Sequence, residues 1–285
     1  MSLVTQLFNG VTMGALLFLV ASGFTLTFGL MRVVNLAHGA LYLLGGYIGL
    51  TVLRATGSFV LGALVGGVAI AVVGLLSERW LLRRLQGNEL AQILLTVGMA
   101  YAIGDLCLAI WGGMPMRVAP PEVLTGATNL FGDFHYPTYR LFLAGLGGVF
   151  ALGLWLLLEK TPIGMAIRAG VDDPEMVGAQ GIRITVLFVV VFTLGAFLAG
   201  MTGVVGGGFL TLYPHADWDV LVLVLVVVIV GGLGSLKGAF VGSLIVGIID
   251  AVGRWLFPEL AYFMIFLPMA IVLMVRPHGL FGREH

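Results

Sequence analysis

Charged residues are scarce in this sequence. Asp, Glu, Lys and Arg together make up 10% of the chain, and their formal charges sum to zero, whereas soluble domains carry about 25% charged residues. Apolar residues make up 60% of the chain, and the mean hydropathy is +1.10. The composition excludes a soluble globular domain. We expect lipid around the chain and no nucleic-acid partner.

The sequence has a single cysteine and no cluster of histidines. Cys107 is the only cysteine and lies within an apolar run, so it cannot form an intramolecular disulfide and is expected to be a small buried residue. The five histidines are scattered over different segments, and no second His or Cys lies at ligand spacing from His38. The sequence therefore predicts no metal site.

Motifs for enzyme chemistry are absent as well. The segment GGLGSLKG has the glycines of a phosphate-binding loop, but it lacks Gly directly before Lys237 and Ser or Thr after it. No local motif assembles a nucleophile, a base and an orienting group. We therefore expect a chain that is not an enzyme, does not hydrolyse ATP by itself and binds no cofactor.

What the sequence has instead is a series of apolar runs, each of about the 20 residues that a helix needs to cross a hydrocarbon core of roughly 30 Å. It predicts an all-α, polytopic membrane protein with Gly-rich broken segments and eight to nine transmembrane helices. The lower number applies if a short piece around Asn35 or Gly232 enters and leaves on the same side. The predicted spans are Leu3–Phe28, Leu36–Leu53, Phe59–Leu76, Leu90–Trp111, Leu141–Leu158, Ile184–Val205, Val220–Gly232, Ala239–Trp255 and Leu260–Val275.

Positive charges are sorted by connection, which predicts the orientation. Connections rich in Lys and Arg stay in the cytoplasm, and this places the N-terminus outside and the C-terminus in the cytoplasm. No Lys or Arg precedes Arg32, so the first run lacks the basic region of a signal peptide and is expected to be a retained span. The deciding residues are Arg79, Arg83, Arg84, Lys160, Arg168, Arg183, Arg276 and Arg283 inside, and Arg117, Glu122, Asp133 and the acidic segment YPHADWD outside.

Polar residues and glycines interrupt the apolar stretch RVVNLAHGALYLLGGYIGL, residues 32–50. Asn35 is predicted to cap the following helix, with His38 in its first turn. The break is either a structural hinge or a place where Asn35 and His38 touch or gate a solute. The chain has 43 glycines, and small residues let membrane helices approach closely. Those expected at helix breaks and close contacts include Gly39, Gly45, Gly46, Gly231, Gly232 and Gly234.

Two carboxylates lie within apolar spans, Asp105 and Asp250. A carboxylate at mid-bilayer costs about 2.5 to 3.5 kcal/mol on insertion scales, so such a residue normally faces a bundle interior or water. Each aspartate either lines a polar pathway or is a structural hydrogen-bonding group near the interface.

The cytoplasmic connection EKTPIGMAIRAGVDDPEMVGAQGIRI contains the signals of a short helix. Asp172, Asp173 and Pro174 resemble a helix start, Glu175 lies in the first turn, and Gly181 would end the helix. A helix of about two turns is marginal alone. It either packs on the protein's own helix ends or is a docking element for a cytoplasmic partner.

Four motifs in order resemble those of the branched-chain amino-acid ABC importer permease family (Liv type). They are GLMRVVNLAHGALYLLGGYIG, DDPEMVGAQGI, GGLGSLKGAFVGSLIVGIID and RPHGLFG. The early start of the first span resembles the shorter of the family's two permease types. The resemblance implies a single transmembrane permease domain, residues 1–285, in the bacterial inner membrane. It also implies a cytoplasmic coupling loop at 159–183 and an external loop at 112–139.

The resemblance further implies a set of partners. Two cytoplasmic ATPase subunits would bind ATP and Mg, a second related permease would complete the pathway as a heterodimer, and a periplasmic solute-binding protein would deliver the solute. The residues expected to couple to the ATPases are Arg168, Ala169, Asp172, Asp173, Pro174, Glu175, Ala179 and Gly181. Branched-chain or related amino acids are the expected solutes.

Two alternatives stay open. Another small solute, such as urea, a short amide or an aromatic acid, would use the same permease with a different receptor. An autonomous channel or ion-coupled carrier would instead need ionisable groups near mid-membrane and no docking loop.

Overall fold

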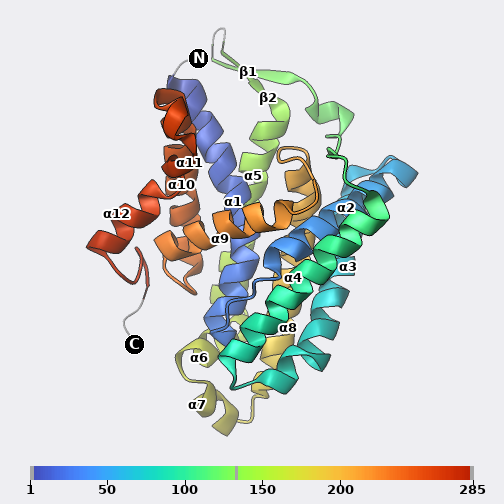
Figure 1. Cartoon of the computed structure of the whole chain (residues 1–285). Coiled ribbons are helices and arrows are strands. Elements are labelled where there is room, and N and C mark those ends of the chain that lie inside the picture. The colour runs from blue at the N-terminus through green and yellow to red at the C-terminus, as the bar shows by residue number, and fades with distance from the viewer. Residues whose placement is uncertain (1–2, 132–133, 283–285) are drawn as a thin grey trace. The chain divides into compact units, whose positions relative to one another are not determined.

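The computed structural model describes residues 3–131 and 134–282, so Asp133 and Arg283, used for the predicted orientation, lie outside the described residues. For Phe131, Pro174 and Tyr262 it describes the backbone alone. The chain is mostly helical (Figure 1). Its contacts form two units. Unit 1 comprises Met1–Ala21, Ala119–Ala151 and Val222–His285, and unit 2 comprises Ser22–Val118 and Leu152–Leu221.

The helices follow the predicted apolar runs closely. Two short strands form an antiparallel hairpin within the predicted external loop. The elements are α1 Leu3–Met31, α2 His38–Thr56, α3 Phe59–Trp80, η1 Leu82–Leu85, α4 Glu89–Trp111, η2 Glu122–Leu124, β1 Ala127–Phe131, β2 Phe134–Pro137, α5 Thr138–Lys160, α6 Pro162–Asp172, α7 Pro174–Ala179, α8 Ile184–Gly207, α9 Ala216–Gly231, α10 Leu236–Leu256, η3 Pro258–Leu260, α11 Ala261–Met264 and α12 Leu267–Val275.

Six segments are long and apolar enough to cross a membrane: α1, α3 extended to Leu85, α4, α5, α8 and α10. The chain is therefore a multi-pass membrane protein. Three of the nine predicted spans are not among these six. α9 has 16 residues and measures about 24 Å, which is short of a hydrocarbon core of roughly 30 Å. α2 has 19 residues but carries His38 and Arg54 near its two ends.

The predicted span Leu260–Val275 is not a single helix. The structure breaks this segment after α11, which ends at Met264, and α12 begins at Leu267. Pro268 lies in the first turn of α12. A proline ring clashes with the carbonyl group four residues earlier and supplies no N–H, so Pro268 prevents the helix from continuing through Met264.

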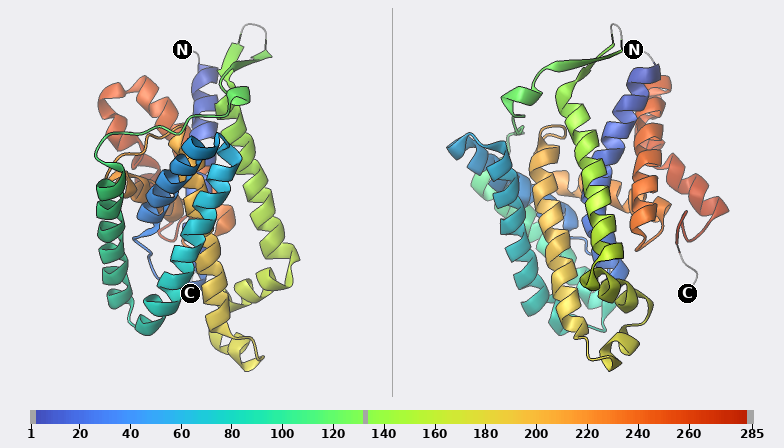
Figure 2. Two further views of the ribbon diagram at one scale, coloured as in Figure 1. Left: turned by 90° about the vertical axis from the view of Figure 1, so that its right-hand side faces the viewer. Right: turned by 180° about the vertical axis from the view of Figure 1, so that it is seen from behind.

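Unit 2 is built around α2, α3 and α8, which pack on one another, with α4 against α2. Figure 2 shows blue α2 and cyan α3 beside gold α8. A Cβ atom added to Gly45 of α2 would lie 2.6 Å from the carbonyl oxygen of Gly200 in α8. One added to Gly62 of α3 would lie 2.7 Å from that of Gly49. Glycine therefore sets the distance between these helices, as expected for small residues in lipid.

Unit 1 joins the N-terminal part of α1 to α10 and to the β-hairpin. A Cβ atom on Gly10 would lie 2.6 Å from the Cα atom of Ile248 in α10. The Tyr136 hydroxyl of β2, 1% exposed, donates a hydrogen bond of 3.0 Å to Oδ1 of Asn9. Thr12 and Tyr136 lie within hydrogen-bond distance at 3.1 Å. These buried polar contacts attach the hairpin to α1.

Candidate coupling surface and helix breaks

The predicted coupling loop contains two helices rather than one. Thr161 caps α6, because its Oγ1 accepts a hydrogen bond of 3.0 Å from the N–H of Gly164, and Pro162 occupies the first helical position. Both are standard signals of a helix start. The sequence predicts only the helix that begins at Asp172–Pro174, so α6 is absent from the prediction, although Thr161 and Pro162 are the signal of its start.

α6 is held against the rest of unit 2 by small and apolar residues. Gly164 touches the backbone of Leu157 and Leu158 at the end of α5, where a side chain would collide. A Cβ atom on Gly170 would lie 3.0 Å from Leu30 of α1. Gly164, Gly170 and the side chain of Ile167 are all buried. α6 is therefore a rigid base for α7 rather than a loose loop.

α7 begins and ends as the sequence predicts. Oδ1 of Asp173 accepts a hydrogen bond of 2.9 Å from the N–H of Met176, and Pro174 is the first helical residue. After the helix, Gly181 has a φ of +83°, and the N–H of Ile182 donates 3.3 Å to the carbonyl of Val177. This is the C-terminal motif that favours glycine at the left-handed position.

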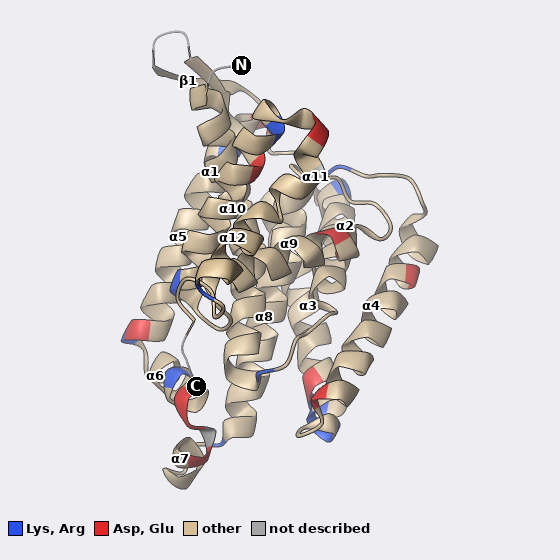
Figure 3. Ribbon diagram, turned by 60° about the vertical axis from the view of Figure 1, so that its left-hand side comes forward, with Lys and Arg blue, Asp and Glu red and all other residues tan. Residues whose placement is uncertain are grey.

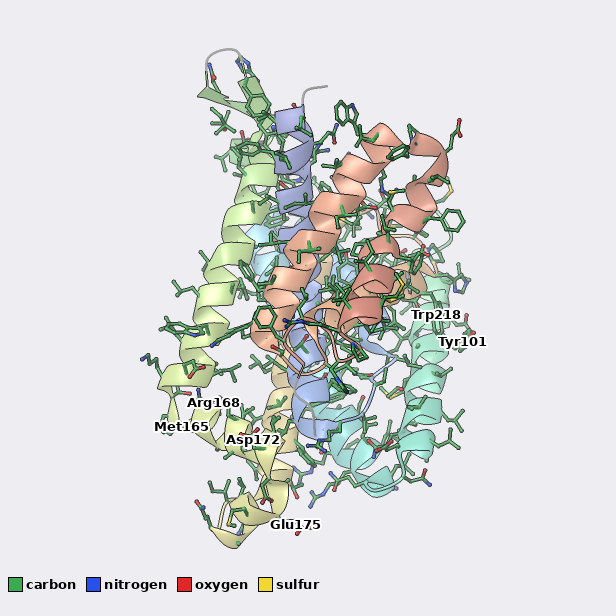
Figure 4. All side chains as sticks on the ribbon, turned by 90° about the vertical axis from the view of Figure 1, so that its left-hand side faces the viewer. Tyr101, Met165, Arg168, Asp172, Glu175 and Trp218 are labelled. Carbon is green, nitrogen blue, oxygen red and sulfur yellow. The ribbon has the colours of Figure 1, made fainter. Side chains whose placement is uncertain are left out.

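An exposed surface of mixed acidic and apolar character runs along α6 and α7. We call it the coupling surface; Figure 4 labels Met165, Asp172 and Glu175 along it. Met165 and Met176 are 55% and 57% exposed, and the three carboxylates are exposed as well. Exposed methionines beside acidic residues are typical of a protein interface rather than of a solvated loop. The members are Ile163, Met165, Asp172, Asp173, Glu175 and Met176.

The remaining predicted coupling residues fall into two groups. Ala169, Ala179 and Gly181 are exposed beside the coupling surface. Arg168 is partly buried and forms an ion pair with Glu159 at the end of α5. Arg168 therefore fastens α6 to α5, and a partner would meet the acidic residues first.

The break between α1 and α2 lies where the sequence predicts it, but Asn35 does not cap α2 directly. Its Oδ1 accepts a hydrogen bond of 3.1 Å from the N–H of Ala37, and Ala37 is the residue before the helix. Asn35 lies two residues before the N-cap position and therefore closes a turn instead of capping α2. His38 is the first residue of α2, is 1% exposed, and contacts the ring of Phe24 edge-on at 5.6 Å.

The second predicted break separates α9 from α10. Gly232 and Gly234 have φ values of +100° and +79°, and Gly231 touches the backbone of Gly238 in α10. The C-terminal segment RPHGLFG covers this break. The N–H groups of Leu280 and Phe281 donate hydrogen bonds of 2.9 and 3.0 Å to the carbonyls of Val230 and Gly231, so the terminal motif occupies acceptors at the end of α9.

The two aspartates predicted for a pathway lie in different units. Asp250 of α10, in unit 1, is buried and accepts a hydrogen bond of 2.7 Å from Nε of Arg254. This pairing fits a structural role. Asp105 of α4, in unit 2, is exposed on a membrane-spanning helix. A carboxylate there needs water or a protein partner rather than lipid.

Comparison with known proteins decides the family. The chain matches the family model described as branched-chain amino acid transport system, permease component, over residues 6–273. The chain belongs to this permease family. It is 28% identical to the high-affinity branched-chain amino acid transport system permease protein LivH of Escherichia coli K12, over 98% of this chain and 95% of that protein.

Two further relatives show the same coverage pattern. The permease is 27% identical to BraD of Pseudomonas aeruginosa, over 98% of this chain and 95% of that protein. It is 26% identical to the probable branched-chain amino acid transport permease protein LivH of Methanocaldococcus jannaschii, over 94% and 89%. No solved structure matches the chain. The chain is a permease subunit of an ABC importer, as its four motifs predict.

Three polar residues of this permease are buried although the sequence does not predict it: Tyr47, Glu78 and Asp217. Asp217 is 2% exposed and Glu78 is fully buried. Asp217 belongs to the acidic segment YPHADWD, and Glu78 is next to Arg79, so their neighbours along the chain predict exposure. The hydroxyl of Tyr47 is buried and has no hydrogen-bond partner among the described residues. Composition alone could not separate these buried groups from exposed ones.

Proposed function

We propose that this chain is one permease half of a bacterial inner-membrane ABC importer for branched-chain or related amino acids, and that α6 and α7 transmit the motion of the ATPase subunits. The observation that carries the proposal is the exposed coupling surface. α6, with its Thr161 cap and its close glycine contacts, holds this surface in unit 2. Unit 2 also carries Arg79 at the end of α3 and Arg83 and Arg84 in η1. Figure 3 shows charged residues gathered at this end of α3, α4, α6 and α7.

The orientation follows from the same charges. Positively charged ends remain in the cytoplasm, so the coupling surface would face the cytoplasm and the N-terminus the outside. Adding α2, α9 and the broken α11–α12 pair to the six long helices gives nine membrane segments. The number is eight if the short piece around Asn35 or Gly232 enters and leaves on the same side. α2 and α9 would be short segments bounded by breaks, which are tolerated where protein or water satisfies the backbone.

The partners follow from this arrangement. Two cytoplasmic ATPase subunits, which would hold ATP and Mg, would bind the coupling surface on this chain and on a second, related permease. A periplasmic solute-binding protein would dock on the external side. ATP binding would draw the ATPases together and move α7 as a lever, which alternates the pathway between outward-open and inward-open states.

Relatives named for branched-chain amino acid transport support that solute class here. Urea, a short amide or an aromatic acid would fit the same architecture with another receptor. The coupling surface favours an ABC importer over an autonomous channel or ion-coupled carrier, because a carrier does not need it. Purified chain in liposomes should therefore not transport leucine without ATPase subunits, and transport under these conditions would contradict the proposal.

The coupling surface is tested by reversing one charge, Glu175→Arg. Glu175 is exposed in the first turn of α7, so reversal should weaken co-purification of the ATPase subunits and lower leucine uptake by roughly tenfold, as expected when one interfacial charge pair is lost. The control is Glu89→Arg, because Glu89 is exposed in the first turn of α4 at the same end of unit 2. Both variants lose the same interaction with a helix dipole. Equal effects of the two would therefore contradict the assignment of Glu175 to the coupling surface.

A further inference from the structure

The starts of α2 and α9 lie against each other in unit 2. Gly39, in the first turn of α2, touches the carbonyl oxygen of Asp217 in the first turn of α9, where any side chain would collide. Arg32 and His215, in the segments that lead to these two helices, have φ values of +53° and +68°. They are the only non-glycine residues with positive φ in the described chain, and strained backbone concentrates at functional sites.

The carboxylate of Asp217 is buried beside this contact. The residue is 2% exposed, and Oδ1 has no hydrogen-bond partner among the described residues. The backbone N–H groups of Asp217 and Trp218 and the exposed side chains of His215 and Asp219 lie nearby. No Lys or Arg of the described residues forms an ion pair with Asp217. A buried charge without a counter-charge is costly, so Asp217 is suited to receive a positive group from outside the chain.

Aromatic rings stand next to this carboxylate. The rings of Tyr101 in α4 and Trp218 are 5.4 Å apart between centroids, and Tyr101 is 55% exposed. Figure 4 shows the two side chains together at one edge of unit 2. Gly104, one turn after Tyr101, comes close to Asp217: a Cβ atom there would lie 3.8 Å from its Oδ2. Exposed Asp105 follows directly. Carboxylates beside aromatic faces favour an ammonium group.

A second buried polar group lies further along α2 and α4. The Tyr47 hydroxyl has no hydrogen-bond partner among the described residues, and its ring stacks on Trp111 at 5.1 Å between centroids. Cys107 of α4, one turn before Trp111, is fully buried as well. The polar groups thus continue from Asp217 into unit 2 between α2 and α4.

We infer that Asp217 binds the ammonium group of a zwitterionic amino acid during transport, with the Tyr101–Trp218 pair at the exposed side of the site. α2 begins without a side-chain cap, so the dipole at its start would favour the carboxylate of the same solute. A metal ion fits less well, because no group of three or more His, Cys, Asp or Glu residues assembles in the described chain. The inference rests on the proposed function and names the solute contact within it.

The test uses the complete importer in proteoliposomes with its solute-binding protein and leucine. Asp217→Asn keeps the shape and removes the charge, so uptake should fall about tenfold or more, as expected for loss of a charged hydrogen bond. ATPase stimulation by the loaded binding protein should persist, because the coupling surface is untouched. Glu89→Gln is the control, since Glu89 is an exposed carboxylate in the first turn of α4 that is not part of the site, and its variant should transport like the unmodified importer.

The outcomes separate the two proposals. Uptake by Asp217→Asn at the unmodified rate overturns the inference and leaves the proposed function intact. An unmodified complex without ATP-dependent leucine uptake overturns the proposed function instead. If Asp217→Asn does not assemble, Tyr101→Leu decides, because its side chain is exposed. Uptake should then fall several-fold with ATPase stimulation retained, and unchanged uptake overturns the inference.

Discussion

Single atoms decide how closely the helices of unit 2 approach one another. A methyl group on Gly45 of α2 would collide with the backbone of Gly200 in α8. Gly98, in α4, has nothing within 4 Å of a Cβ atom. The same residue type thus has opposite roles: one glycine is needed for contact, and the other only weakens its helix.

This contrast predicts opposite effects of the same substitution. Gly45→Ala should destabilise the protein by about 1 to 3 kcal/mol, because the added methyl group meets backbone that cannot move aside. Gly98→Ala should be neutral or stabilising by up to about 1 kcal/mol, because alanine favours the helix. Thermal unfolding of the two variants in detergent measures the difference. A similar loss of stability in both would show that the close contact at Gly45 is not needed.

At the scale of elements, capping decides whether α7 exists as a helix. A helix of 6 residues has little intrinsic stability, so the Asp173 cap, Pro174 and the Gly181 terminus carry much of it. α6 has the same design, with Thr161 and Pro162 at its start.

Asp173 therefore offers a way to separate capping from charge. Asp173→Ala should destabilise α7 by about 1 kcal/mol, because the N–H of Met176 loses its acceptor. Asp173→Asn keeps the acceptor oxygen and removes the charge. Hydrogen exchange of residues 174–182 should speed up in Asp173→Ala and stay close to the original in Asp173→Asn. Faster exchange in both variants would assign the stability to charge rather than to the cap.

At the scale of the whole molecule, the orientation determines which helix ends and connections face the cytoplasm. The positive-inside rule predicts that α7 lies inside and the loop before β1 outside. Cys107 is the only cysteine of the chain, so its replacement by alanine leaves a background for site-directed labelling.

Two single-cysteine variants in this background test the orientation. Gly126→Cys lies before β1 and Gly178→Cys lies in α7, and both positions are exposed with open space for a side chain. A membrane-impermeant maleimide should label Gly126→Cys in intact spheroplasts and Gly178→Cys only after permeabilisation. Labelling in the reverse order would show that the topology is inverted. The coupling surface would then lie outside, where no ATPase subunit could reach it.

The sequence by itself determined what depends on neighbours along the chain. Apolar runs located the helices, and Asp173, Pro174 and Gly181 located α7, because caps and turns use residues within four positions. Pro268 also had a local consequence, although the apolar composition around it concealed the break. The glycines indicated close packing without naming their partners.

Only the tertiary structure decided which polar residues are buried together. Gly39 and Asp217 are far apart in the chain, and Asp217 belongs to an acidic segment whose composition predicts exposure. Their contact arises because α2 and α9 both begin beside α4, and it buries Oδ1 of Asp217, which has no hydrogen-bond partner among the described residues. Local sequence patterns do not predict such a contact, because it depends on how helices that are distant in the sequence pack against one another.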